Sequence, residues 1–223
     1  GSVSAENGTV TQTAESGNIS VGSSVSAKNG TISQNAKSGS VETGSVSAES
    51  SSVTQTAGSG SITVNGSVDS KDSTITQTAL VGAITINGNV TATDTEKNST
   101  LTMHAGTKVK TNDIILTNNT GKPGTELDVD VGNGGAEIGK IKLLDSQTAV
   151  DAAKSVLVKG TIYLDPSELT LTAGENIVVE DTVEVTDSST ATFTVSGNLE
   201  FKKNVTVTGS TFEALAKDGK AGN

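Results

Sequence analysis

Aliphatic residues return at a fixed spacing along the first part of the chain. Near-copies of one repeat begin at Gly1, Gly22, Gly44 and Gly66, with a looser fifth copy at Gly88. Three series of Val and Ile advance through them in steps of 21 or 22 residues: Val3, Val25, Val46, Val68 and Val90; Val10, Ile32, Val53 and Ile75; and Ile19, Val41, Ile62 and Ile84. A constant period of this length is the sequence signature of a repeat architecture.

Each copy predicts three short strands separated by turns. In the first copy the strands are residues 2–4, 9–11 and 19–21, and Asn7-Gly8 and Ser16-Gly17 lie between them. β-branched residues favour strands, whereas Asn and Gly favour turns. Asn-Gly also favours a hairpin, but a strand of about three residues buries too little to hold an isolated hairpin. Stacked copies avoid this difficulty, because each strand pairs in parallel with its equivalents above and below.

We therefore predict an all-β fold, a right-handed parallel β-helix (β-solenoid) with about 22 residues per coil in the first half. Stacking at about 4.8 Å gives about ten coils and a rod roughly 50 Å long. Alternation along the strand places Val10 on the inner face and Thr9 and Thr11 on the outer face. Residues 1–112 are expected to form the regular part, and residues 113–223 to continue the same domain as a less regular solenoid.

The second half shows strand-like runs at unequal spacing. They lie at residues 114–117, 126–131, 140–144, 156–164, 168–172, 177–179, 182–186, 190–195, 199–201 and 204–208. We expect the solenoid to continue here with loops of varying length. Residues 147–155 and 213–217 are expected to form short helical turns, the second because Ser210 and Glu213 match a capping box.

A polar column accompanies the aliphatic ones. Gln12, Gln34, Gln55 and Gln77 hold the same place in four copies, and Ala14, Ala36, Ala57 and Ala79 follow two residues later. Alternation places these amides on the same side as Val10. Two arrangements satisfy them: a ladder of amide hydrogen bonds between stacked coils, or a corner position that faces water.

Composition narrows the classes of function. Hydrophobic residues make up 32% of the chain and aromatic residues 2%, which favours a thin, repetitive core. The formal net charge is −10, the 15 Lys and Arg residues are all Lys, and Cys is absent. Because phosphate contacts need Lys/Arg clusters, we expect no nucleic-acid partner. No apolar stretch approaches the roughly 18 residues of a membrane span. The chain begins inside a repeat, so we expect it to be a segment of something longer.

Thr-x-Thr runs are the most regular surface feature. Thr9, Thr11 and Thr13 in the first copy, with their equivalents, predict a flat outer ladder. It resembles the ice-binding faces of antifreeze proteins, but Ser33 and Asn35 interrupt it. We favour the simpler interpretation that Thr is a soluble outward residue on a strand.

Candidate catalytic and metal-binding chemistry is sparse. Asp128, Asp130 and Asn133 offer oxygens of the kind that bind Ca²⁺, but a solvated strand and turn explains them as well. His104 is the single histidine, and no partner for it is evident nearby. We assign no catalytic, cofactor-binding or metal-binding residues. Sequons for N-glycosylation begin at Asn7, Asn18, Asn29, Asn65, Asn89, Asn98, Asn118 and Asn204.

The motifs Gly-Ser-Val-Ser-Ala, Gly/Ser-x-Ile/Val-x-Gln-x-Ala and Ser-Gly-x-Ile-x-Val recur over residues 1–89. In them the chain resembles filamentous-haemagglutinin-like adhesins and, next, autotransporter passenger domains. The resemblance implies an extracellular or cell-surface protein that contacts host or neighbouring cells, without enzymatic activity. The composition also fits a self-assembling surface-layer or filament protein. A polysaccharide-acting β-helix enzyme is the third hypothesis, since this fold also hosts enzymes.

Overall fold

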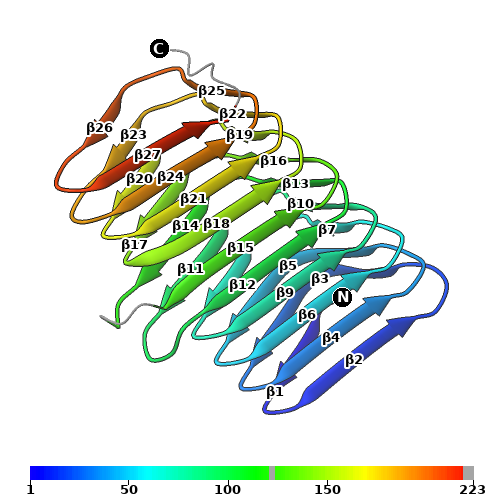
Figure 1. The fold of residues 1–223 in the computed structure, drawn as a ribbon. Helices are drawn as coiled ribbons and strands as arrows, with labels where there is room; N and C mark the ends of the chain where they lie inside the picture. The colour runs from blue at the N-terminus through cyan, green and yellow to red at the C-terminus, as the bar shows by residue number, and fades with distance from the viewer. Residues whose placement is uncertain (121–123, 218–223) are drawn as a thin grey trace.

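The computed structural model describes residues 1–120 and 124–217. Its regular secondary structure is entirely β: 27 strands pair in parallel and wind into one solenoid (Figure 1). The predicted fold class, an all-β parallel solenoid of about ten coils, is confirmed. A ten-stranded sheet forms one side of the solenoid and a seventeen-stranded sheet forms the other, with the core between them (Figure 1).

The ten-stranded sheet takes one strand from each coil, so we number the coils by its members. In order from coil 1 to coil 10 they are β2 (Thr9–Ala14), β4 (Thr31–Ala36), β6 (Ser52–Ala57), β9 (Thr74–Ala79), β12 (Thr100–Ala105), β15 (Thr125–Val131), β18 (Ser146–Ala152), β21 (Glu168–Ala173), β24 (Thr190–Val195) and β27 (Thr211–Ala216). Equivalent residues of consecutive strands stand side by side, as Thr9 and Thr31 do.

The seventeen-stranded sheet contains two ladders. The first comprises β1 (Val3–Glu6), β8 (Val68–Lys71), β11 (Val90–Asp94), β14 (Ile114–Asn118), β17 (Ile141–Leu144), β20 (Ile162–Asp165), β23 (Val183–Val185) and β26 (Val205–Val207). The second comprises β7 (Ile62–Val64), β10 (Ala83–Ile86), β13 (Lys108–Thr111), β16 (Gly135–Ile138), β19 (Val156–Val158), β22 (Asn176–Val179) and β25 (Asn198–Phe201). Two longer strands, β3 (Ile19–Lys28) and β5 (Val41–Glu49), run through both ladders.

The predicted aliphatic columns form the core. Val3 stands beside Val25, and Val25, Val46, Val68 and Val90 are each 0% exposed. The same column continues through Ile114, Ile141, Ile162 and Val183 in the second half. Because each residue packs on its equivalents above and below, one apolar side chain per strand position suffices to build a continuous interior.

The amide column lies inside the solenoid. Gln34 Nε2 donates to Gln12 Oε1 at 2.7 Å, Gln55 Nε2 to Gln34 Oε1 at 2.8 Å, and Gln77 Nε2 to Gln55 Oε1 at 2.8 Å. Gln34, Gln55 and Gln77 are 0% exposed. The stacked ladder is therefore correct, and the corner position is not.

Both predicted helical turns are wrong. Residues 147–155 fall mostly in β18, which pairs on one side with β15 and on the other with β21. Residues 213–217 fall mostly in β27, which pairs with β24. Ser146, Thr148, Val150 and Ala152 alternate inward with exposed neighbours, a period of two that outweighs the helical propensity of an Ala-rich run. The expected single run 156–164 is also divided, because a corner separates β19 from β20.

Candidate functional site: the outer face of the ten-stranded sheet

The outer face of the ten-stranded sheet is a regular array of short polar side chains. The first, third and fifth residues of each six-residue strand point outward, so Thr9, Thr11 and Thr13 align with Thr31, Ser33 and Asn35. Later coils add Thr190, Thr192 and Thr194 to the array. Outward Thr residues occur in coils 1–5 and 8–10, Ser33 and Asn35 interrupt them in coil 2 as expected, and coils 6 and 7 have none.

Carboxylates replace the hydroxyls in the middle of this face. Coils 6 to 8 place there Glu126, Asp128, Asp130, Asp151 and Glu168. Asp130 stands beside Asp151 in the register of β15 and β18. No lysine within the described residues occupies an outward position on this sheet. We call this group of five the acidic band.

His104 has a partner that its sequence neighbours do not indicate. It lies on the outer face of β12 beside Asp130, and the distance from His104 Nδ1 to Asp130 Oδ2 is 2.8 Å. The two side chains are 44% and 50% exposed. Of the two places expected for His104, an exposed position or a corner, the structure shows a partly exposed position within a strand. The signal is the coil register, since the two residues are 26 positions apart in the chain.

The candidate Ca²⁺ ligands do not converge. Asp128 and Asp130 lie on the outer face of β15, and Asp130 is paired with His104, while Asn133 follows in the exposed turn. Across residues 1–120 and 124–217, no group of three or more His, Asp or Glu side chains is placed to hold a metal ion. The structure therefore gives these oxygens no common centre.

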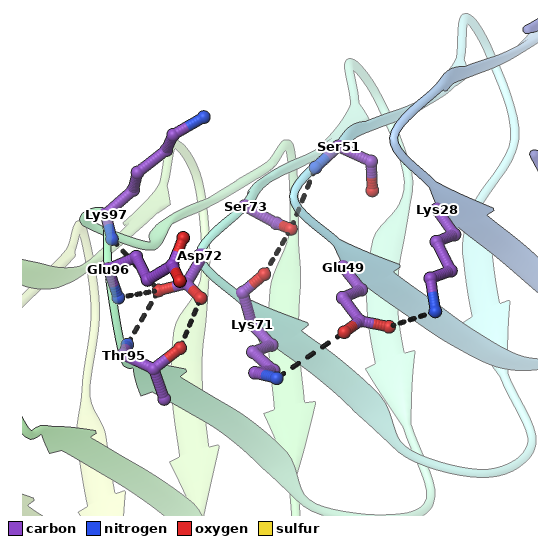
Figure 2. A network of polar contacts seen from close by, with 9 residues as sticks. All are labelled: Lys28, Glu49, Ser51, Lys71, Asp72, Ser73, Thr95, Glu96 and Lys97. Carbon is purple, nitrogen blue, oxygen red and sulfur yellow. Dashed lines mark hydrogen bonds and ion pairs between the residues drawn. The ribbon is translucent and has the colours of Figure 1, made fainter. Parts of the chain in front are cut away.

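Charged residues on the other side of the solenoid are arranged in pairs between coils. Glu49 lies between Lys28 and Lys71, with Oε2 at 3.5 Å from Lys28 Nζ and Oε1 at 3.4 Å from Lys71 Nζ (Figure 2). Lys28 and then Lys71 lower the pKa of Glu49. Glu137 contacts Lys108 and Lys159 at 2.6 Å each, and hydrogen bonds from these lysines lower its pKa to about 2.

Asp72 organises a corner between coils 4 and 5. Its Oδ1 accepts hydrogen bonds from the backbone N–H groups of Thr95 at 2.7 Å, Glu96 at 2.9 Å and Lys97 at 3.1 Å, and the Thr95 hydroxyl donates to Oδ2 (Figure 2). Burial raises the pKa of this carboxyl, but the hydrogen bonds from Glu96, Thr95 and Lys97 outweigh burial and hold the pKa well below its usual range. The carboxylate is thus a structural acceptor for an otherwise unpaired turn.

Serine hydroxyls form a second ladder at the corner before the ten-stranded sheet. Ser73 Oγ accepts from the backbone N–H of Ser51 at 3.1 Å and donates to the Lys71 carbonyl oxygen at 2.6 Å (Figure 2). The pattern returns where Ser167 Oγ accepts from Ser146 N–H at 3.1 Å. The sequence analysis did not predict this ladder. Its signal was a Ser directly before most strands of the ten-stranded sheet.

The sequons differ in accessibility. Asn118 is buried at 7% exposure, and Asn89 is half-buried. The exposed members are Asn7, Asn18, Asn29, Asn65, Asn98 and Asn204. A folded chain therefore presents six of the eight side chains to solvent.

The fold defines the chain as a parallel β-solenoid repeat protein, with a core continuous through all coils and an ordered polar face. Comparison with protein-family models, with curated proteins and with solved structures finds no match to it. The resemblance of its repeats to surface adhesins therefore stays a prediction. Within the described residues, no helix has the length and apolar character needed to cross a membrane.

Proposed function

We propose that the chain is a stiff rod or spacer in a bacterial cell-surface or secreted protein that serves adhesion. The observation that carries the proposal is the uninterrupted core: every coil stacks in register on the next, from β2 to β27. At about 4.8 Å per coil, ten coils separate the two ends by roughly 50 Å. A solenoid whose repeats contact only their neighbours transmits force along one axis.

Polar ladders between coils support the mechanical role. The glutamine chain from Gln12 to Gln77 and the Ser51–Ser73 contact each join consecutive coils through side chains. The Lys28–Glu49–Lys71 column does the same on the opposite sheet. Bending the rod opens these contacts on the convex side, so they oppose bending in addition to the backbone pairing.

Single-molecule pulling from the two termini tests the spacer role. A coil of about 22 residues releases about 75 Å of chain when it detaches, so a force trace should show steps of that size at resolvable force. A variant with Val53→Asp should lose resistance in coil 3 first, whereas the matched outer-face variant Thr54→Asp should not. Featureless extension of the wild-type chain at low force would reject the spacer role.

The adhesive role needs a separate measurement. Beads coated with the chain should be retained on cell monolayers under flow more than beads coated with albumin. Equal loss of both bead types would remove adhesion from the proposal and leave the spacer role to the pulling experiment. Incubation with acidic polysaccharides and Ca²⁺ addresses the enzyme hypothesis, since turnover would replace the mechanical proposal with a catalytic one.

A further inference from the structure

The acidic band has no lysine on its own face among the described residues. Its five carboxylates carry a formal charge of −5, and His104 is the single basic side chain at an outward position among the described strands of that sheet. Elsewhere the carboxylates of Glu49, Glu137 and Glu180 each have a lysine within 4 Å. The molecule therefore places lysines beside carboxylates on one sheet, whereas on the other sheet the basic neighbour is His104, which contacts Asp130.

Lysines gather at the same height on the opposite sheet. Coils 5 to 7 place on its strands and linking turns Lys108, Lys110, Lys140, Lys142 and Lys159. The carboxylates among them are Asp113, Glu137 and Asp165, which leaves a formal charge of +2 (five lysines minus three acids). Partly exposed apolar side chains lie between the lysines: Ile115, Leu144, Leu157 and Tyr163. We call this region the lysine band.

We propose that a second copy of this chain docks side by side, with the acidic band of one copy against the lysine band of the next. The two sheets lie on opposite sides of the core (Figure 1), and the two bands share coils 6 and 7, so a sideways translation with a shift of about one coil along the axis brings them together. A contact between two different faces leaves a free face on each copy, so it continues into rows. This inference goes beyond the spacer role.

The contact is large enough to be specific. The whole outer face of the ten-stranded sheet, about 50 Å long and about 20 Å wide, covers roughly 1,000 Å² per partner, which falls within the range of stable protein–protein interfaces, and the three coils of each band supply roughly 300 Å² of it. The Thr and Ser side chains that flank the acidic band are short, so the face is flat enough for such an approach. Burial of Leu157 and Tyr163 at the centre adds an apolar contribution.

Two electrostatic effects act against each other. The net charge of −10 repels copies at long range, whereas the two bands attract at contact. At about 0.1 M salt the Debye length is about 10 Å, so the long-range repulsion is screened and the contact persists. At about 1 M the Debye length is about 3 Å and the contact weakens as well. Association is therefore expected to be strongest near 0.1 M salt.

Sedimentation velocity of the full chain at about 100 μM provides the test. The wild-type chain should form dimers and longer species at about 0.1 M NaCl and lose them at about 1 M, with at least a tenfold weaker association constant. The double variant Asp128→Lys/Asp151→Lys changes the formal charge of the acidic band from −5 to −1 (−5 plus 4), and Lys110→Glu/Lys142→Glu changes that of the lysine band from +2 to −2 (+2 minus 4). Each alone should remain monomeric, and an equimolar mixture of the two should associate.

A matched control separates local from overall charge. Glu6→Gln removes one negative charge from an exposed position on β1, several coils away from both bands, and should leave association within about twofold of wild type. All five substituted side chains point outward, so each variant is expected to fold. Far-UV circular dichroism checks this. A wild-type chain that stays monomeric at about 0.1 M salt, or a mixture of the two double variants that does not associate, overturns the proposal.

Discussion

Replacing Gln55 with Leu tests the buried amide ladder most directly. Gln55 donates to Gln34 and accepts from Gln77, each at 2.8 Å, and all three side chains are fully buried. Leu has nearly the same volume, so the Gln55→Leu change alters polarity with little effect on packing. It leaves Gln34 Oε1 without a donor and Gln77 Nε2 without an acceptor.

The cost follows from these two stranded groups. A buried polar group without a partner costs about 1–3 kcal/mol, so two of them cost about 2–6 kcal/mol, and the apolar side chain returns part of this. We expect the free energy of unfolding to fall by roughly 3 kcal/mol. For a chain of this size that corresponds to a decrease in Tm of roughly 6–12 °C.

Urea and thermal unfolding followed by far-UV circular dichroism measure the effect. The informative comparator replaces Gln12, Gln34, Gln55 and Gln77 together with Leu, because removing every member strands no polar atom and is nearly neutral or stabilising. We therefore expect the fourfold variant to be more stable than the single one. A Gln55→Leu chain as stable as wild type, or a fourfold variant at least as unstable as the single, would refute the ladder as an energetic unit.

Three further substitutions test other parts of the solenoid. Val53→Asp buries an unpaired carboxylate at a position with 0% exposure and should lower the free energy of unfolding by more than about 4 kcal/mol. The outward change Thr54→Asp should lower it by less than about 0.5 kcal/mol. Equal losses of stability in thermal melts would contradict the column assignment. Asp72→Asn should lower the free energy of unfolding at pH 7. Because the native pKa of Asp72 is depressed, the difference in stability between wild type and variant should shrink in urea melts as pH falls below about 4. A difference that does not change with pH would contradict the role of the Asp72 carboxylate. Gly134→Ala places a Cβ 1.4 Å from the carbonyl oxygen of Thr107, whereas the Cβ in Gly132→Ala lies 3.8 Å from its nearest neighbour, the carbonyl oxygen of Gly106. Gly134→Ala should therefore destabilise the chain far more than Gly132→Ala. Comparable unfolding midpoints would disprove the close approach of the backbone at Gly134.

The repeat made most of the first half predictable. Once Val25 and Val46 hold equivalent places in inner coils, burial of one implies burial of the other. The second half keeps the columns but changes the steps, for example from Val90 to Ile114 and from Ile114 to Ile141. Loops of different length at the corners therefore hide a core that is still in register.

Local propensity failed where pairing between coils decides the conformation. Residues 147–155 have the composition of a helix, but their alternating inward positions match those of β15 and β21. The candidate site shows the same limit. Asp130 suggested a metal ligand beside Asp128, whereas the register places it against His104 and Asp151. A charged face is assembled from residues 21 to 26 positions apart, which local motifs do not connect.

The chemistry of the core also explains why the early repeats are regular and the later ones are not. The position of Gln77 in the fifth coil is Met103, and Gln77 Oε1 has no hydrogen-bond partner among the described atoms. An amide inside the ladder, such as Gln34 or Gln55, hydrogen-bonds to an amide on each side, so the ladder links the coils that contain it. Beyond Met103 the equivalent positions are Val129, Val150 and Leu171, and apolar side chains of similar volume exchange at low cost. The near-identical copies therefore coincide with the glutamine ladder, and sequence divergence begins where this column becomes apolar.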